Sequence, residues 1–434
     1  TSLQESARRR IEDAIPEYFT LNNQRVTVAE VQAKLRSDEA LVRFIVGDAR
    51  SYGFVVSRAT SIIYPIALYS DDISAAVATL RTSIEAKGAK PFEVAAAADL
   101  YAKLFGPAAP EISAKAHLVV VPEGSLLRLP MGILVTAAPS NLTPGDYSGV
   151  DFLARSKTLT ISPSAGSFVA QRGAAPSRAS EAFVAFADFT PPSAASLADT
   201  QEALRCGDRV LSENSFTPLP ETYAEAVSVA TSLGVRHSAV IRGAGFTKTK
   251  FQDEAKSLEN YRIVYFATHG FLPNEYACNV QPGLLMSYAP GLSATDLILT
   301  APEIMQLSLD ADLVVLSACN TAGGGLTGQG ARVGESLSGL VRAFFQAGSR
   351  SVIATHWAVP SEQSVTLMAG AFDNFKGEAG DFAAALRNAQ TKMIAGGGVT
   401  SHPFYWGAYT VNGAGAFDKQ STALQAQNQA DRTQ

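Results

Sequence analysis

Two apolar runs near the middle of the chain constrain its fold more than any other feature. Residues 261–270 run to His269 and Gly270, and residues 312–321 run to Cys319 and a short polar end. Both runs begin with β-branched or aromatic residues, which is typical of strands buried in a parallel sheet. Parallel strands gather catalytic and binding groups at their carboxyl edge. If the two runs are neighbouring strands, His269 and Cys319 meet at that edge.

The remaining chain alternates between strand-like and helix-like segments. Periodicity and turn residues predict strands at 40–46, 52–58, 61–68, 117–122, 181–188, 237–242, 350–355 and 404–411. The same signals predict helices at 3–19, from Thr27 to Leu35, and at 71–87, 92–105, 221–233, 334–347, 361–375 and 380–395. Glu30 follows Thr27 by three residues and completes a capping box. This alternation favours an α/β fold with a mostly parallel sheet covered by helices on both faces.

The length of 434 residues exceeds one ordinary core, so we expect two units. The first is 28–172 and the second 173–415, which opens with an Ala/Pro/Ser-rich stretch at 173–180. The first unit has Pro122-Glu-Gly where the second has Cys319, and we interpret it as a related, non-catalytic half. Residues 1–27 form a charged amphipathic helix that either packs on the body or continues a helical array. Residues 416–434 are polar and Gln-rich, and are expected to form a mobile tail.

The composition excludes several classes of protein. A formal net charge of −5 and a pI near 5.7 give no general attraction to nucleic acid or to an anionic membrane. No apolar run approaches the roughly 20 residues that span a bilayer. The three cysteines, Cys206, Cys278 and Cys319, cannot build a disulfide framework. These features predict a cytoplasmic location.

Cys319 and His269 are the candidate catalytic residues. A free cysteine often packs as a small hydrophobic residue, but Cys319 ends its run and precedes a glycine-rich segment. His269 also ends a run and is followed by Gly270. His356 is the rival base, although its neighbours Trp357, Val359 and Pro360 suggest a pocket wall. Imidazole beside thiol is the minimal pair for nucleophilic catalysis, because the base generates the attacking thiolate.

The backbone amides of Gly270 and Cys319 are candidates for a two-donor oxyanion hole, because a small residue after the base leaves its N–H open. No pair of His, Cys, Asp or Glu falls at metal-ligand spacing, so no metal site is expected. The segment 328–334 resembles a dinucleotide-binding fingerprint but misses its last spacing. We therefore expect cleavage chemistry that needs no cofactor.

Several segments together resemble the CHAT domain family. They are Tyr-Phe-Ala-Thr-His-Gly at 265–270, Leu-Val-Val-Leu-Ser-Ala-Cys-Asn-Thr-Ala at 313–322, and the segments 121–130, 163–165, 343–354 and 402–409. That family consists of caspase- and separase-like cysteine peptidases, often attached to tetratricopeptide helical repeats, and the resemblance covers most of 28–412. It implies a caspase-like fold with His269 as general base and Cys319 as nucleophile. It also implies that residues 1–27 are the end of a repeat region.

One departure from the family pattern affects the expected substrate-binding residues. Separase-like members tend to carry Trp-x-Val-x-Asp after the strand that follows the nucleophile, and this Asp recognises a basic residue before the cut. Here the segment runs from Trp357 to Ser361 and Glu362, with Ser361 in the acidic position. Either Glu362 replaces the missing charge, or the pocket binds a neutral residue before the cut. The neutral pocket is favoured, because a basic substrate residue without an acidic partner would bury an unpaired guanidinium, which is costly. Alternatively, Ser361 only caps the next helix.

These observations predict a cysteine endopeptidase that cleaves specific proteins through a Cys-His dyad. Its activity is expected to be controlled by a partner or by attached tetratricopeptide-type repeats. The resemblance implies a regulatory substrate, such as a pore-forming protein of a cell-death or bacterial defence pathway. Two alternatives stay open: a catalytically silent caspase-like scaffold, and a thiol-dependent hydrolase or transferase that acts on a non-peptide acyl substrate.

Overall fold

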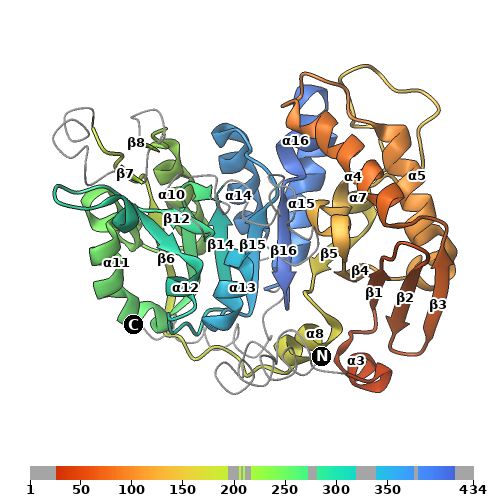
Figure 1. Ribbon diagram of the computed structural model, residues 1–434, viewed down its shortest axis with the longest axis horizontal. Helices are drawn as coiled ribbons and strands as arrows, with labels where there is room; N and C mark the ends of the chain where they lie inside the picture. The colour runs from red at the N-terminus through yellow and green to blue at the C-terminus, as the bar shows by residue number, and fades with distance from the viewer. Residues whose placement is uncertain are drawn as a thin grey trace.

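The structure is a computed structural model that describes residues 26–193, 205–206, 209–210, 217–271, 281–318, 339–375 and 380–415. The predicted helix at 3–19, the predicted tail at 416–434 and Cys319 lie outside these residues. Strands of both halves lie side by side across the molecule, with helices in front of and behind them (Figure 1). None of the helices in the described ranges is long and apolar enough to cross a bilayer.

One eleven-stranded sheet carries both halves of the chain, in the order β3-β2-β1-β4-β5-β16-β15-β14-β10-β6-β9. Its strands are β1 (Glu39–Ile45), β2 (Ser51–Ser57), β3 (Ser61–Ile66), β4 (His117–Val121), β5 (Thr158–Ile161), β6 (Glu181–Ala187), β9 (Val240–Arg242), β10 (Tyr261–Ala267), β14 (Leu313–Ser317), β15 (Ser351–Thr355) and β16 (Tyr409–Gly413). A smaller sheet contains β11 (Gly270–Phe271), β12 (Gly283–Leu285) and β13 (Ile298–Thr300), and β7 (Arg205–Cys206) pairs antiparallel with β8 (Arg209–Val210).

Seven of the described helices follow the sequence signals, and six were not predicted. They are α3 (Val28–Lys34), α4 (Ser70–Glu85), α5 (Val94–Phe105), α6 (Ala109–Ile112), α7 (Leu153–Ser156), α8 (Ala165–Gly173), α10 (Glu221–Leu233), α11 (Lys248–Glu254), α12 (Ala301–Ile304), α13 (Gly339–Gln346), α14 (Ser361–Phe375), α15 (Phe382–Ala395) and α16 (Pro403–Trp406). The Thr27–Glu30 capping box at α3 is confirmed. Helix α10 has its predicted bounds, because Gly234 adopts a left-handed φ of 72° and ends it.

The two halves are joined into one sheet by the pairing of β5 with β16. That pair is parallel, whereas β16 and β15 are antiparallel. Strands β1, β4 and β5 therefore run opposite to β15, β14 and β10. The sequence predicted two units with related designs, and the shared sheet was not foreseen.

Two strand predictions were partly wrong. Residues 404–406 belong to the short helix α16, because Pro403 stands in its first turn and the His402 ring accepts the Phe404 amide at 3.1 Å. The last strand therefore begins at Tyr409. The segment 237–242 is a strand only at Val240–Arg242, since residues 237–239 form a 3₁₀ turn.

Alternating side chains along the strands pack into two separate cores, one on each face of the sheet. Leu41 and Val119 pack with Phe168 of α8 on one face of the sheet. Val42 and Val120 face the other side and join the large core that continues into the second half. This two-residue period is what a strand covered on both faces requires. It explains why these segments lack a polar face in the sequence.

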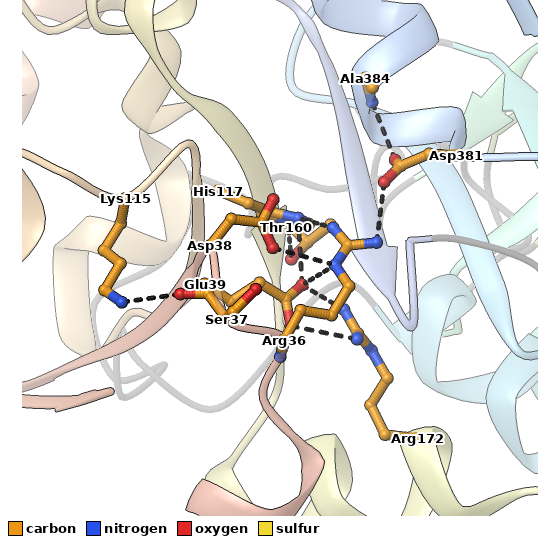
Figure 2. Close-up of polar contacts among 10 residues, drawn as sticks. All are labelled: Arg36, Ser37, Asp38, Glu39, Lys115, His117, Thr160, Arg172, Asp381 and Ala384. Atoms are coloured by element: carbon orange, nitrogen blue, oxygen red, sulfur yellow. Dashed lines mark hydrogen bonds and ion pairs between the residues drawn. The ribbon is translucent and has the colours of Figure 1, made fainter. Parts of the chain in front are cut away.

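An ion network around the buried Glu39 holds the first half against α15 (Figure 2). Glu39, at the start of β1, is fully buried, and Arg172 reaches its two carboxylate oxygens at 2.7 and 3.2 Å. The Arg36 guanidinium lies between Glu39, with Nε 3.1 Å from Oε1, and Asp381, with Nη1 3.0 Å from Oδ2. Asp381 also caps α15 by accepting the Ala384 amide. The network thus links α8, β1 and α15.

The His117 ring in this network is a neutral acceptor. Burial and the charge of Arg36 lower the pKa of His117 to about 3. A guanidinium can only donate, so Nδ1 of His117 accepts from Arg36 at 2.5 Å and Nε2 donates to Thr160 at 3.0 Å. His117 is therefore a structural residue.

The network predicts an unequal cost for removing cations. Arg172→Met should lower the free energy of unfolding by about 2–4 kcal/mol, because Glu39 keeps its buried charge and loses its bidentate partner. Lys103→Ala is the matched control, since its pair with Asp99 is 40% and 62% exposed and should contribute less than about 1 kcal/mol. Urea titrations of both variants measure the two values. Equal losses would contradict a special role for the Glu39 network.

Candidate active site

The two apolar runs are neighbouring parallel strands, as the sequence analysis required. β10 pairs with β14 in a register that sets Ala267 opposite Ser317. Both strands therefore end at the same edge, where β10 continues into Thr268 and His269 and β14 continues into Ala318. Cys319 follows Ala318 in the sequence and lies outside the described residues, so its position stays a prediction.

Buried polar contacts fix this register at the amino ends of the strand pair and anchor the carboxyl ends to the strands on either side. At the amino ends, Arg262 Nε donates to Asp312 Oδ2 at 2.6 Å, and both side chains are buried. At the carboxyl ends, the Thr268 hydroxyl donates to the Leu285 carbonyl at 2.9 Å. The Thr355 hydroxyl donates to the carbonyl of Ala318. The edge that carries His269 is thus anchored to β12 on one side and to β15 on the other.

His269 is held in one orientation by a backbone carbonyl. Its Nε2 lies 2.8 Å from the carbonyl oxygen of Thr217, and because that oxygen only accepts, Nε2 must carry a proton. The neutral ring then has Nδ1 as its acceptor, which is the state that a general base needs. Phe189 packs edge-on against the ring at 5.5 Å, and Phe271 stacks at 6.4 Å. These contacts leave the half-buried imidazole little rotational freedom.

Gly270 begins β11 and pairs with Leu284 of β12, while the His269 carbonyl accepts the Leu285 amide at 2.9 Å. This short antiparallel pairing fixes the backbone next to His269. The oxyanion role of the Gly270 and Cys319 amides stays a prediction, because Cys319 is not among the described residues.

His356, the rival base, lies in an unsuitable environment. It is 4% exposed, and burial together with the charge of Arg81 lowers its pKa to about 3. Trp357 is 5% exposed, its indole N–H donates to the Phe404 carbonyl at 2.9 Å, and Arg81 lies 5.2 Å over its ring. The environment of His356 favours His269 as the base. The substrate-binding role of Trp357 stays a prediction.

Ser361 contacts an acid that is remote in the sequence. Its hydroxyl donates to the carboxylate of Glu221, the first residue of α10. Glu362 is exposed on the first turn of α14. The carboxylate nearest to position 361 is therefore provided by Glu221, and sequence reasoning considered only Glu362.

A second acid of α10 was missed entirely. Glu225 is 2% exposed, and the Tyr265 hydroxyl donates to its carboxylate at 2.5 Å. Burial raises the pKa of Glu225 to about 7 and the Glu221 charge adds to this rise, while hydrogen bonds from Ser317 and Tyr265 lower it. The sequence did contain a signal for a buried acid, because Glu225 stands four residues after Glu221 on the apolar face of the predicted helix.

Within the described residues, no group of three or more His, Cys, Asp or Glu side chains is arranged to hold a metal ion. The described groups in contact with the His269 ring are the Thr217 carbonyl and the rings of Phe189 and Phe271. They orient the imidazole, whose other nitrogen is then an acceptor suited to proton transfer.

The strand order and the covering helices define the fold of caspase-like cysteine peptidases. The chain is similar to separase in the Saccharomyces cerevisiae separase-securin complex, with a TM-score of 0.50, 8% identity, and coverage of 88% of this chain and 30% of that one. It is also similar to gingipain R, an Arg-specific cysteine proteinase, with a TM-score of 0.42, 12% identity, and coverage of 80% and 75%.

The CHAT domain model matches residues 94–414, and the chain belongs to the CHAT domain family. Its curated relatives include tetratricopeptide repeat protein 28 of Mus musculus and of Homo sapiens, with 28% and 25% identity over 193 residues. The matched region is 44% of this chain and 7% of the length of those relatives.

The buried Glu225 predicts a specific pH dependence of stability. Its pKa of about 7 in the folded protein exceeds the ordinary value of 4.5, so its stabilisation is complete below pH ~4.5 and is lost as the pH rises through ~7. Wild-type stability should fall across this window by up to roughly 3 kcal/mol. Glu225→Gln removes the titration, so its melting temperature relative to wild type should rise from pH 5 to pH 8.

Thermal melts followed by circular dichroism at several pH values test this expectation. Glu362→Gln removes an exposed carboxylate from α14 and should leave the slope unchanged. A constant difference between Glu225→Gln and wild type across the range would contradict the raised pKa.

Proposed function

We propose that the chain is a cysteine endopeptidase in which Cys319 is the nucleophile and His269 the general base. The observation that carries the proposal is the register of β10 and β14, which ends both strands at one edge. The hydrogen bond from His269 Nε2 to Thr217 supports it, because it presents Nδ1 as a proton acceptor.

The chemistry follows from these groups. Nδ1 of His269 accepts the Cys319 thiol proton, and the thiolate attacks the scissile carbonyl carbon. The developing oxyanion accepts hydrogen bonds from the Gly270 and Cys319 amides. As the C–N bond breaks, the imidazolium returns its proton to the leaving amine, and water then hydrolyses the thioester. No step needs a metal or a cofactor.

Regulation and substrate are also part of the proposal. The curated relatives are tetratricopeptide repeat proteins, and repeats of that kind would provide the surface that selects a substrate or restrains the peptidase. We propose a protein substrate with a regulatory role, such as a pore-forming protein of a defence pathway, and a cytoplasmic site of action.

Cleavage should depend on both proposed catalytic residues. Cys319→Ala and His269→Ala should each lower the rate on a proteome-derived peptide library by on the order of 10³-fold or more, because neither group acts without the other. Cys206→Ser, in strand β7, is the matched cysteine control and should cleave like wild type. Mass spectrometry of the products gives the rates. Undiminished cleavage by Cys319→Ala would contradict the proposal.

The same library tests which acidic residue recognises the substrate residue before the cut. The Ser361 hydroxyl contacts Glu221, so the wild-type enzyme should prefer a basic residue before the cut. Glu221→Gln should lower this preference about tenfold or more, because a neutral amide does not neutralise a guanidinium. Glu362→Gln is the matched exposed control. A wild-type preference for neutral residues would instead support the neutral pocket that the sequence favoured.

A further inference from the structure

A chain of hydroxyl groups connects the buried Glu225 of α10 to the end of β14. Glu225 accepts from Tyr265 of β10 at 2.5 Å and is also hydrogen-bonded to the Ser317 hydroxyl. Ser317 Oγ lies 3.0 Å from the Tyr409 hydroxyl, which donates to Ser364 of α14 at 3.1 Å. Five elements, α10, β10, β14, β16 and α14, thus contribute to one network.

This network reaches the end of β14, the strand that leads to the proposed nucleophile. Ser317 is the last residue of β14 and stands two positions before Cys319. Tyr265 stands four positions before His269 on the neighbouring strand. A change in hydrogen bonding at Ser317 therefore acts on the backbone that leads to the proposed nucleophile.

The charge of Glu225 decides where the Ser317 proton points. Tyr409 donates its proton to Ser364, so the single proton of Ser317 can go to Tyr409, to Tyr265 or to Glu225. An ionised Glu225 only accepts, and it draws the Ser317 proton into a charge-assisted hydrogen bond, which is the stronger kind. A neutral Glu225 carries its own proton, donates it to a hydroxyl, and turns the Ser317 proton towards one of the two tyrosine hydroxyls, Tyr409 or Tyr265.

The surroundings of Glu225 allow both arrangements near neutral pH. Its own helix brings Glu221, β10 brings Tyr265, and β14 brings Ser317; Tyr409 of β16 and Ser361 and Ser364 of α14 complete the set. The described groups that act on Glu225 are hydroxyls and a second carboxylate, with no cation among them. The raised pKa of about 7 agrees with this environment.

We propose that Glu225 is a positioning residue of the active site, which sets the direction of the Ser317 hydroxyl and so holds the end of β14 that leads to Cys319. This inference rests on the proposed function. Glu225 itself does not touch substrate and acts through Ser317.

The test compares wild type with Glu225→Gln, Ser317→Ala and the double variant, all in a Cys206→Ser, Cys278→Ser background. The readouts are kcat and KM on a cleaved peptide, and the rate at which iodoacetamide alkylates Cys319, from pH 5.5 to 8.5. The ratio of the wild-type rate to the variant rate at each pH removes the pH dependence that the two proteins share. The pH dependence that is left reports the contribution of Glu225.

At pH 8 the kcat of wild type should exceed that of Glu225→Gln by about tenfold, with KM within about twofold. At pH 6 wild-type Glu225 is neutral like glutamine, so the two rates should agree within about twofold. The alkylation ratio should show the same trend. The double variant should be no slower than Ser317→Ala, because both substitutions break one connection.

Ser232→Ala is the matched control, because it removes a hydrogen bond between α10 and Asp373 of α14 that does not reach β14. Its rate ratio to wild type should not change with pH. If Glu225→Gln does not fold, Tyr265→Phe takes its place. The Tyr265→Phe substitution removes one hydrogen-bond donor to Glu225, so the ratio of its rate to the wild-type rate should change with pH.

A pH-independent ratio for Glu225→Gln, or additive losses in the double variant, would overturn the positioning role. If wild type cleaves nothing, the proposed function fails. The alkylation ratio at Cys319 then still decides the positioning inference, because it reports the end of β14 without any substrate.

Discussion

The parallel ladder between β10 and β14 is the constraint on which the rest of the structure depends. A buried Arg262–Asp312 pair fixes its amino ends, and the hydroxyls of Thr268 and Thr355 anchor its carboxyl ends to the strands on either side. A slip of one residue would turn the buried side chains of these strands to the opposite face. The ladder therefore determines both the core packing and the edge at which His269 stands.

Two buried glutamates show how one fold uses the same side chain in different ways. Glu39 is matched by the guanidinium groups of Arg36 and Arg172, which joins α8, β1 and α15 into a rigid unit. Among the residues that the structure describes, Glu225 is matched by hydroxyls beside a second carboxylate, Glu221. Full cation pairing suits a structural contact, whereas hydroxyl pairing leaves a group that can exchange its proton near neutral pH.

Local signals were sufficient for most elements. The α10 helix ends at Gly234 because only glycine adopts its left-handed φ without strain, and the α3 cap follows from Thr27 and Glu30. The prediction failed at residues 404–406, where aromatic residues suggested a strand. There, Pro403 and the His402 ring favour a helical turn. Apolar runs this short do not distinguish strand from helix.

Strand periodicity, a local property of the chain, predicted the α/β sheet, and short motifs predicted the CHAT family and with it a caspase-like fold. The same motifs proposed His269 as the base, which stays a prediction. The sequence could not place Glu221 against Ser361 or Glu225 against Tyr265, since these partners are 140 and 40 positions apart. It also could not show that both halves share one sheet. Only tertiary packing decided these contacts, because the burial and the hydrogen-bond partners of a side chain depend on which elements meet.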